Sequence, residues 1–157
     1  MNTQAYFNHI AEQITQQLQK AQQSVHIAVA WFTDASLFEL LCKKSKQGVR
    51  IQLMLMNDEI NNTCGIDYNL LVKAGGKVWK AGNENENLMH NKFCIIDGEI
   101  VINGSYNWTN KAKQNHESIT VIEDKGLASQ FIDEFFFLKK NSELLTWPKF
   151  HCRDFEE

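Results

Sequence analysis

The chain has 157 residues and a mass of 18.1 kDa, the size of one globular domain with its own hydrophobic core. An apolar fraction of 43% and a charged fraction of 22%, with a single proline, exclude a disordered, collagen-like or proline-rich chain. Sixteen basic against 19 acidic residues leave a net charge of −3, so attraction to nucleic acid would have to come from a local patch.

Membrane and export signals are missing from the sequence. No apolar run is long enough to span a bilayer, and residues 1–10 lack the basic and apolar segments of a signal peptide. The four cysteines, Cys42, Cys64, Cys94 and Cys152, form no C-x-x-C pair and no zinc-like spacing. We therefore expect reduced thiols in a cytoplasmic protein, with Cys94 in the core and no bound metal or cofactor.

The first half of the chain alternates helical and β-prone segments. Apolar residues at helical spacing predict an amphipathic helix over residues 3–22. Asp34 is the expected N-cap of a second helix that runs through Gln47, with Gly48 at its C′ position. The other predicted elements are strands at 24–32, 49–56 and 77–80 and a short helix at 67–74. The polar stretch 83–87 is expected to be a mobile loop.

The second half begins with a hairpin signal. Asp97-Gly98 lies between two apolar runs, a strong indication of a tight turn between antiparallel strands at 92–96 and 99–102. A strand at 118–122 and a helix at 127–140 follow. This order predicts an α/β domain over residues 1–145, with a mixed sheet and helices on both faces.

Two features of the C-terminal part have open interpretations. Phe135, Phe136 and Phe137 put aromatic rings on more than one side of the last helix, which fits either a deeply buried helix or one covered by a second subunit. Residues 146–157 are expected to be a tail, either docked on the domain at a natural end or the edge of a longer protein.

One stretch has the pattern H-x-K-x-x-x-x-D followed by G-S-x-N. His90 and Lys92 are two residues apart on a predicted strand and should point to the same face. Asp97 makes the turn; it belongs to the pattern and is counted with the catalytic candidates, although we expect it to be a turn former. The returning strand then delivers Ser105 and Asn107 near the same edge.

This set of side chains fits phosphoryl transfer. An imidazole can be a nucleophile or a general acid near neutral pH, while an ammonium, a hydroxyl and a carboxamide are donors to phosphate oxygens. The sequence has no carboxylate cluster typical of a magnesium site, so protein groups would neutralise the phosphate. Each residue alone has a commoner explanation as a surface or turn residue. Their convergence on one hairpin favours the functional interpretation.

The same pattern resembles the signature of the phospholipase D superfamily. The segment HNKFCIIDGEIVINGSYNWTN is similar in particular to small bacterial phospholipase-D-like nucleases. The similarity extends from about Tyr6 to Leu138 and includes the strand end Ala30-Trp31-Phe32-Thr33 and the segment Gly48-Val49-Arg50. This resemblance implies a layered α/β sandwich with one copy of the motif in the chain.

The resemblance also implies a mechanism. Family members combine two motifs in one site, so a chain with a single copy should form a homodimer with the site on its two-fold axis. One His90 would form a phosphohistidine, and the other would protonate the leaving oxygen. Lys92, Ser105 and Asn107 would hold the phosphate. Glu117 matches the acid that orients the histidine, with one residue fewer between Asn107 and Glu117.

The leading hypothesis is thus a metal-independent nuclease acting on DNA, RNA or both. Candidate substrate contacts near the motif are Trp31, Thr33, Tyr106, Trp108, Lys111 and Lys113. The aromatic residues could stack on bases and the lysines could steer a backbone, although Trp108 could equally pack under its loop and the lysines could simply be solvated.

Two other functions remain compatible with the sequence. A phospholipid phosphodiesterase would share the motif, but the chain lacks an amphipathic membrane segment and a basic anchoring cluster, so we expect no membrane partner. A catalytically idle dimerisation or nucleic-acid-binding module is the third possibility, and the presence of every expected catalytic residue type argues against it.

Overall fold

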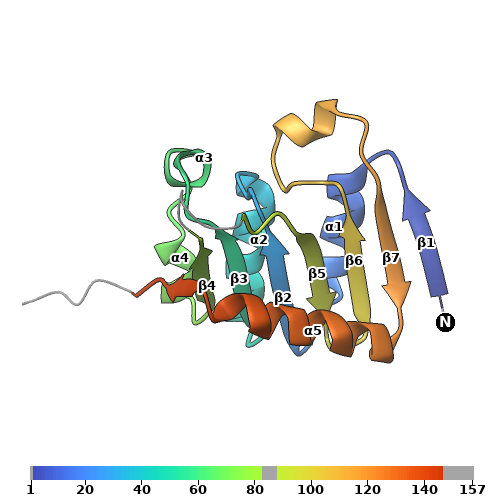
Figure 1. The fold of residues 1–157 in the computed structure, drawn as a ribbon. Helices are drawn as coiled ribbons and strands as arrows, with labels where there is room; N and C mark the ends of the chain where they lie inside the picture. Colours follow the sequence, from blue (N-terminus) through green and yellow to red (C-terminus); the bar gives the residue numbers. More distant parts are fainter. Residues whose placement is uncertain (1, 83–87, 147–157) are drawn as a thin grey trace, which may run out of the picture.

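The computed structural model describes residues 2–82 and 88–146, and the loop expected at 83–87 and the tail from residue 147 lie outside them. The described residues form an eight-stranded sheet in the order β1-β7-β6-β5-β2-β3-β4-β8 (Figure 1). The strands are β1 Asn2–Tyr6, β2 Ser24–Val29, β3 Arg50–Met56, β4 Lys77–Ala81, β5 Lys92–Ile96, β6 Ile100–Gly104, β7 Ile119–Glu123 and β8 Ser142–Leu144.

The sheet is mixed, as the sequence predicts. β2, β3 and β4 are parallel, whereas β5, β6, β7 and β1 extend the sheet on one side as antiparallel neighbours and β8 pairs antiparallel with β4 on the other. The helices are α1 Ile10–Gln19, α2 Ala35–Lys46, α3 Glu59–Asn62, α4 Asn69–Lys73 and α5 Lys125–Lys139, with a 3₁₀ turn at Lys111–Gln114. The predicted α/β class is confirmed.

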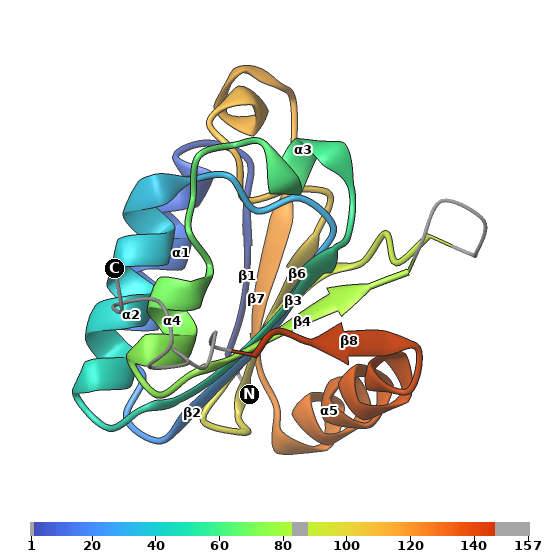
Figure 2. The same ribbon diagram turned by 90° about the vertical axis from the view of Figure 1, so that its left-hand side faces the viewer.

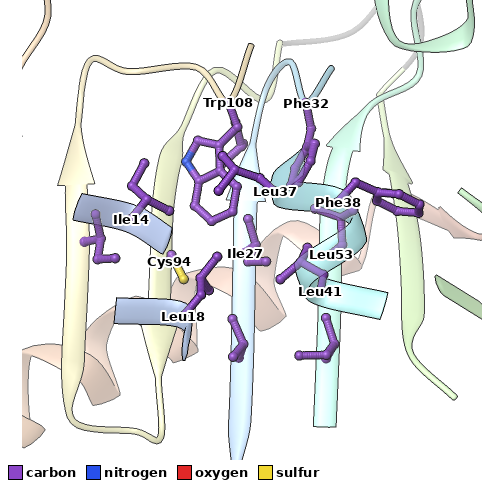
Figure 3. Packing of buried hydrophobic residues seen from close by; sticks show 14 of the residues in the cluster. Ile14, Leu18, Ile27, Phe32, Leu37, Phe38, Leu41, Leu53, Cys94 and Trp108 are labelled. Carbon is purple, nitrogen blue, oxygen red and sulfur yellow. The ribbon is translucent and has the colours of Figure 1, made fainter. Parts of the chain in front are cut away.

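Two hydrophobic layers hold the helices on opposite faces of the sheet (Figure 2). α1, α2 and α4 cover one face, where fully buried Ile14, Leu18 and Leu41 pack with sheet residues such as Ile27 (Figure 3). Burying each such side chain stabilises the fold by about 1.5–3 kcal/mol. α5 covers the other face through Phe135.

Local sequence signals explain several element ends. The carboxylate of Asp34 accepts hydrogen bonds from Ser36 N at 3.0 Å and Leu37 N at 3.2 Å, so it caps α2 as predicted. The β5–β6 turn places both Asp97 (φ 54°) and Gly98 (φ 66°) in the left-handed region, as a tight hairpin of this kind requires. Cys94 is fully buried, as expected, and burial raises the pKa of its thiol.

The predicted helix over residues 3–22 is wrong at its start. Residues 2–6 form β1, which pairs with β7 from Asn2↔Glu123 to Tyr6↔Ile119. The pairing satisfies backbone groups that β7 would otherwise expose at the sheet edge, and this outweighs the helical spacing of Tyr6 and Phe7. His9, with φ 51°, separates β1 from α1.

Two short elements, α3 and β8, were not predicted. Asp58 caps α3 by accepting from Asn61 N at 3.1 Å, and β8 pairs with β4 through contacts such as Lys80↔Glu143. The three aromatic residues of α5 differ in burial: Phe135 is fully buried, whereas Phe136 and Phe137 are 46% and 57% exposed. The helix is therefore buried on one side and exposed on the other in the isolated chain.

Candidate active site

Strand register gathers the motif at one edge of the sheet. Phe93 pairs with Asn103 and Gly104 pairs with Ile119, so residues just before β5, just after β6 and just before β7 meet at the same end. β2 and β3 also end here. We call this end the site edge; its defining residues are Trp31, His90, Lys92, Ser105, Asn107 and Glu117.

Gly104 allows β6 and β7 to approach closely beside Ser105. A Cβ atom at this position would lie 2.1 Å from the carbonyl oxygen of Ser118 and 2.8 Å from Cα of Ile119. Both neighbours are backbone atoms and cannot move without shifting the strand. The glycine of the G-S-x-N pattern is thus required by close backbone packing.

His90 and Lys92 lie together on the exposed side of this edge. The Lys92 ammonium donates to the carbonyl oxygen of His90 at 2.8 Å, and its Nζ is 3.2 Å from Nδ1 of the His90 ring. Partial burial lowers the pKa of Lys92, and the nearby carboxylate of Glu117 partly offsets this effect. The predicted pairing of an imidazole and an ammonium on one face is present in the structure.

Ser105 and Glu117 form the second part of the site. The Ser105 hydroxyl donates a short hydrogen bond to Oε2 of Glu117 and accepts one from Ser118 N at 3.1 Å. Asn115 Nδ2 also donates to Oε1 of Glu117, at 3.4 Å. Among the described residues of a single chain no hydrogen bond joins Glu117 to His90, so its role in orienting a histidine stays a prediction.

Trp31 connects several parts of the site edge. Its backbone N–H donates to Oδ1 of Asn107 at 3.3 Å, and its indole Nε1 donates to Oδ2 of Asp58 at 2.6 Å. The indole ring stands nearly perpendicular to the His90 ring, with centroids 5.5 Å apart and an interplanar angle of 82°. Trp31, predicted as a substrate contact, thus packs against the histidine.

Sequence reasoning missed Asp58 and Asn61. Asn61 is buried and ties the end of β2 to the end of β3, since its amide donates to the carbonyl oxygens of Ala30 and Met56 at 2.8 Å and accepts from Phe32 N at 3.0 Å. Both residues directly follow a predicted buried strand. Because this strand runs parallel to the strand ending at Trp31, their position in the sequence could have placed them at the same sheet edge.

Asp97, the last residue of the H-x-K-x-x-x-x-D pattern, lies at the opposite end of β5 from His90, so counting it as catalytic is wrong. The extended chain between them spans about 20 Å. Its carboxylate accepts hydrogen bonds from three successive backbone N–H groups, those of Gln22 at 3.0 Å, Gln23 at 2.7 Å and Ser24 at 3.0 Å. Asp97 therefore fastens the β5–β6 turn to the start of β2.

Two predicted aromatic substrate contacts are buried in the structure. Tyr106 and Trp108 are each only 2% exposed, and the Trp108 ring packs in the core 5.2 Å from Phe32 (Figure 3). The prediction that these rings stack on bases is wrong for this conformation, because the chain here turns Tyr106 and Trp108 toward the core. Trp108 instead fixes the backbone, its carbonyl oxygen accepting from Thr33 N and Asp34 N at 2.9 Å.

The remaining candidates lie on the rim. Thr33 is half-buried beside Trp108, and Lys111 is exposed on the 3₁₀ turn. Lys113 is exposed too, but its ammonium is 3.4 Å from Oδ2 of Asp34 and 3.0 Å from Oδ1 of Asn110. Of these two lysines, only Lys111 has no ion pair within the described part of the chain.

The described residues contain neither a metal-binding cluster nor a membrane-spanning helix. Within residues 2–82 and 88–146, no three His, Cys, Asp or Glu side chains lie close enough together to hold a metal ion. No helix in the same ranges is long and apolar enough to cross a membrane.

Known proteins are similar to this chain in sequence. A mitochondrial cardiolipin hydrolase of Chlamydomonas reinhardtii is 33% identical over 119 residues, 75% of this chain and 52% of that protein. A phospholipase D of Rickettsia prowazekii is 29% identical over 130 residues, 82% of this chain and 62% of that protein. The chain thus spans about half to three fifths of the length of these curated relatives.

The fold has solved counterparts. The crystal structure of Nuc from Salmonella typhimurium, a phospholipase D family member, matches with a TM-score of 0.81 at 19% identity, covering 93% of this chain and 99% of that one. Residues 14–138 match the family described as "Cardiolipin synthase, PLD-like domain". With this match over most of its length, the chain belongs to the phospholipase D superfamily.

Proposed function

We propose that this protein is a metal-independent phosphodiesterase that cleaves nucleic acid through a phosphohistidine on His90. The observation that carries the proposal is the meeting of an imidazole, an ammonium, a hydroxyl and a carboxylate at the site edge. These groups supply a nucleophile, phosphate donors and an orienting acid. Lys92, Ser105 and Asn107 would hold the non-bridging oxygens of the phosphate.

The reaction would proceed by two displacements. In the first, a ring nitrogen of His90 forms a bond to phosphorus while the bond from phosphorus to the leaving oxygen breaks, and the partner's His90 gives that oxygen a proton. In the second, water attacks phosphorus, its proton passes to the partner's His90, and the bond between phosphorus and nitrogen breaks. Each step therefore needs both histidines. The first step needs a neutral nucleophile and a protonated acid, and the second needs the phosphorylated His90 and a neutral partner histidine that accepts the proton of water.

The need for a second histidine supports a homodimer. The sequence contains one H-x-K-x-x-x-x-D pattern, and His90 is exposed at the site edge of the isolated chain, where a second copy can reach it. A two-fold axis through this edge would bring the two His90 rings to opposite sides of one phosphate. Light scattering at micromolar concentration should give twice 18.1 kDa.

The rim of the site favours nucleic acid as the substrate. Exposed side chains with both donors and acceptors, or with a positive charge, surround the catalytic groups: Asn91, Asn110, Lys111, Gln114 and Asn115. Such groups suit the sugar–phosphate backbone and the edges of single-stranded bases. Lys111 supplies a local positive charge to this polar rim, although the net charge of the chain is −3.

A second candidate is a phospholipid phosphodiesterase. The named relatives are a cardiolipin hydrolase and a phospholipase D. Three large apolar side chains are also exposed near the site edge: Phe7 follows β1, Ile60 lies on α3, and Leu88 precedes His90 by two residues, with exposures of 67%, 52% and 64%. Such side chains could enter a lipid interface.

One experiment separates these candidates. Protein is incubated with single-stranded DNA, plasmid DNA, RNA and cardiolipin-containing vesicles, each with and without excess EDTA, beside the His90→Asn variant. We expect cleavage of nucleic acid that survives EDTA and disappears in His90→Asn. Cleavage of vesicle lipid alone would favour the second candidate, and activity that needs added magnesium would contradict a metal-independent site.

A further inference from the structure

A cavity of about 450 Å³ lies between the start of α1 and the segment that follows Ser105, and none of the catalytic groups lines it directly. One wall is the connection from β1 to α1 and the first turn of α1, including Phe7 and Glu12. The other is the G-S-x-N segment with the 3₁₀ turn and the residue after it, including Tyr106, Lys113 and Asn115. The mechanism above uses none of these five side chains. Its volume exceeds that of a single nucleobase and is far smaller than a protein domain would need.

The cavity adjoins the phosphate-binding groups. The link is Asn115, which lines the cavity and whose Nδ2 donates to Oε1 of Glu117 at 3.4 Å. A molecule in the cavity would thus sit one side chain away from the Ser105–Glu117 pair. A nucleotide attached to the reacting phosphate is the part of a substrate that would occupy this space.

The charged groups of the cavity wall are the Glu12 carboxylate and the Lys113 ammonium. The pKa of Tyr106 is raised to about 12, first by burial and then by the negative charges of Asp34, Glu12 and Glu117. Lys113, the cation on the wall, is already 3.4 Å from Asp34. Because Asp34 already pairs with Lys113, the cavity offers a phosphate no free positive charge, whereas the Glu12 carboxylate can accept from a neutral ligand that presents N–H donors.

Phe7 provides a surface for a flat ring. Its side chain is 67% exposed at the rim of the cavity, although a phenylalanine of this kind is usually buried. Stacking on an exposed aromatic ring is a common way to hold an unpaired base. An acyl chain would instead require an apolar lining, and the lining here includes charged and amide side chains.

We propose that this cavity binds the nucleobase next to the reacting phosphate and prefers guanine, with Phe7 stacking on the ring and Glu12 accepting its N–H groups. The inference rests on the proposed nuclease function and adds a specificity to it. Guanine presents two adjacent donors, N1–H and the 2-amino group, to a single carboxylate, whereas adenine, cytosine and uracil each present donors at one atom of that edge. The carboxamide of Asn115 can pair with the remaining acceptor.

The test uses single-stranded oligonucleotides that carry one guanine in an otherwise uniform pyrimidine sequence. We expect cleavage at a fixed position relative to the guanine. Replacing guanine by hypoxanthine removes only the 2-amino group and should lower kcat/KM about tenfold, the scale of one hydrogen bond to a charged group. Glu12→Gln should bring the ratio of kcat/KM for guanine to kcat/KM for hypoxanthine closer to one. Phe7→Ala should raise KM about tenfold.

Matched controls lie on the other face of the molecule. Phe137 and Glu134 are exposed on α5, so Phe137→Ala and Glu134→Gln should leave both the ratio and KM unchanged. A thermal melt of each variant identifies any loss of folding. Equal kcat/KM for guanine and hypoxanthine in the wild type, with cleavage at every position, would overturn the base preference while leaving the nuclease function intact.

A binding measurement separates this inference from the proposed function. Guanosine, added to isotope-labelled protein, should shift the NMR signals of residues 7–12 and 112–115, and inosine should shift them less. This readout needs no cleavage. If nucleic acid is not cleaved, the proposed function fails on that result alone; if guanosine leaves these signals unchanged, the cavity does not bind a base.

Discussion

The indole nitrogen of Trp31 donates to Asp58 at 2.6 Å, a short hydrogen bond between two residues at the ends of neighbouring parallel strands. The same ring stands against the His90 imidazole, with an interplanar angle of 82°. Asp58 is itself fixed because it caps α3. This chain of contacts restricts the positions that the His90 ring can adopt before a phosphate arrives.

Trp31→Phe keeps an aromatic ring beside His90 but loses the N–H group. We expect kcat to fall about tenfold with little change in KM, because the phosphate donors remain while the histidine is less well held. Asp58→Asn should act in the same direction. Trp79→Phe is the matched control, since Trp79 Nε1 has no hydrogen-bond partner within the described residues. Wild-type kcat in Trp31→Phe would mean that the contact does not position His90.

Lys92 should limit activity at high pH. Burial lowers its pKa below 10.5, so kcat/KM should fall as the pH rises through this lowered value, earlier than for an ordinary lysine. Glu117 raises the pKa of Lys92, so Glu117→Gln should move the alkaline limb to still lower pH. Lys92→Arg should remove that limb. Lys92→Ala should lower kcat about 100- to 1000-fold, as for other lost transition-state donors.

Asp97 should contribute to stability and not to catalysis. Asp97→Asn weakens three hydrogen bonds from backbone N–H groups to a carboxylate, and we expect a loss of about 1–3 kcal/mol in unfolding free energy. In a domain of this size each kcal/mol lowers the Tm by about 2–4 °C. Asp133→Asn, on the exposed side of α5, is the control. A large loss of kcat at unchanged Tm would instead mean that Asp97 acts in catalysis.

The sequence predicts the part of the site that depends on strand alternation and turn chemistry. Asp97-Gly98 defines the hairpin, and the hairpin register then places His90, Lys92 and Ser105 at one edge. What the sequence could not predict depends on tertiary contacts. Trp108 carries no local signal that it turns inward, because its burial depends on packing against Phe32 from another strand end.

The N-terminal segment illustrates the same limit. Tyr6 and Phe7 fit a helical period, and only the free edge of β7 decides that residues 2–6 extend the sheet. Asp58 and Asn61 lie in a stretch without apolar periodicity, so they could be placed at the site edge only once β2 and β3 were known to be parallel. The role of a residue could thus be predicted where its neighbours in the sequence determine its position. It could not be predicted where contacts with distant strands determine that position.

His26 should make the fold less stable in mild acid. Its pKa is lowered from 6.5, first by burial and then by the positive charges of Lys139 and Arg50, and its ring packs against Phe135 with centroids 5.3 Å apart. The unfolded chain therefore binds a proton that the folded chain does not. Stability should fall as the pH drops from about 6.5 toward the lowered folded-state pKa.

Thermal melts between pH 7.5 and 5 check this dependence. His26→Phe keeps the aromatic contact with Phe135 and should flatten the fall of Tm with pH. His116→Gln changes an exposed histidine and should keep the wild-type slope. An unchanged slope in His26→Phe would assign the acid sensitivity to other groups.

The shared site can be tested by mixing subunits. If each active site needs His90 from both chains, random exchange of wild-type with His90→Asn protein gives activity proportional to the square of the wild-type fraction. An equal mixture should then retain about a quarter of the wild-type activity, whereas independent sites would retain about half. His90→Asn suits this test because Lys92, Ser105 and Asn107 remain to bind substrate. A linear dependence on the wild-type fraction would contradict the shared site.

The two His90 copies should take different roles on one phosphodiester. They begin chemically identical, and a bound phosphodiester makes the in-line copy the nucleophile and the copy beside the leaving oxygen the acid. Quenching wild type with phosphorus-labelled substrate should trap an acid-labile, base-stable adduct on His90. A chiral phosphorothioate should react with retention, because two displacements invert phosphorus twice; inversion without an adduct would mean that water attacks phosphorus directly.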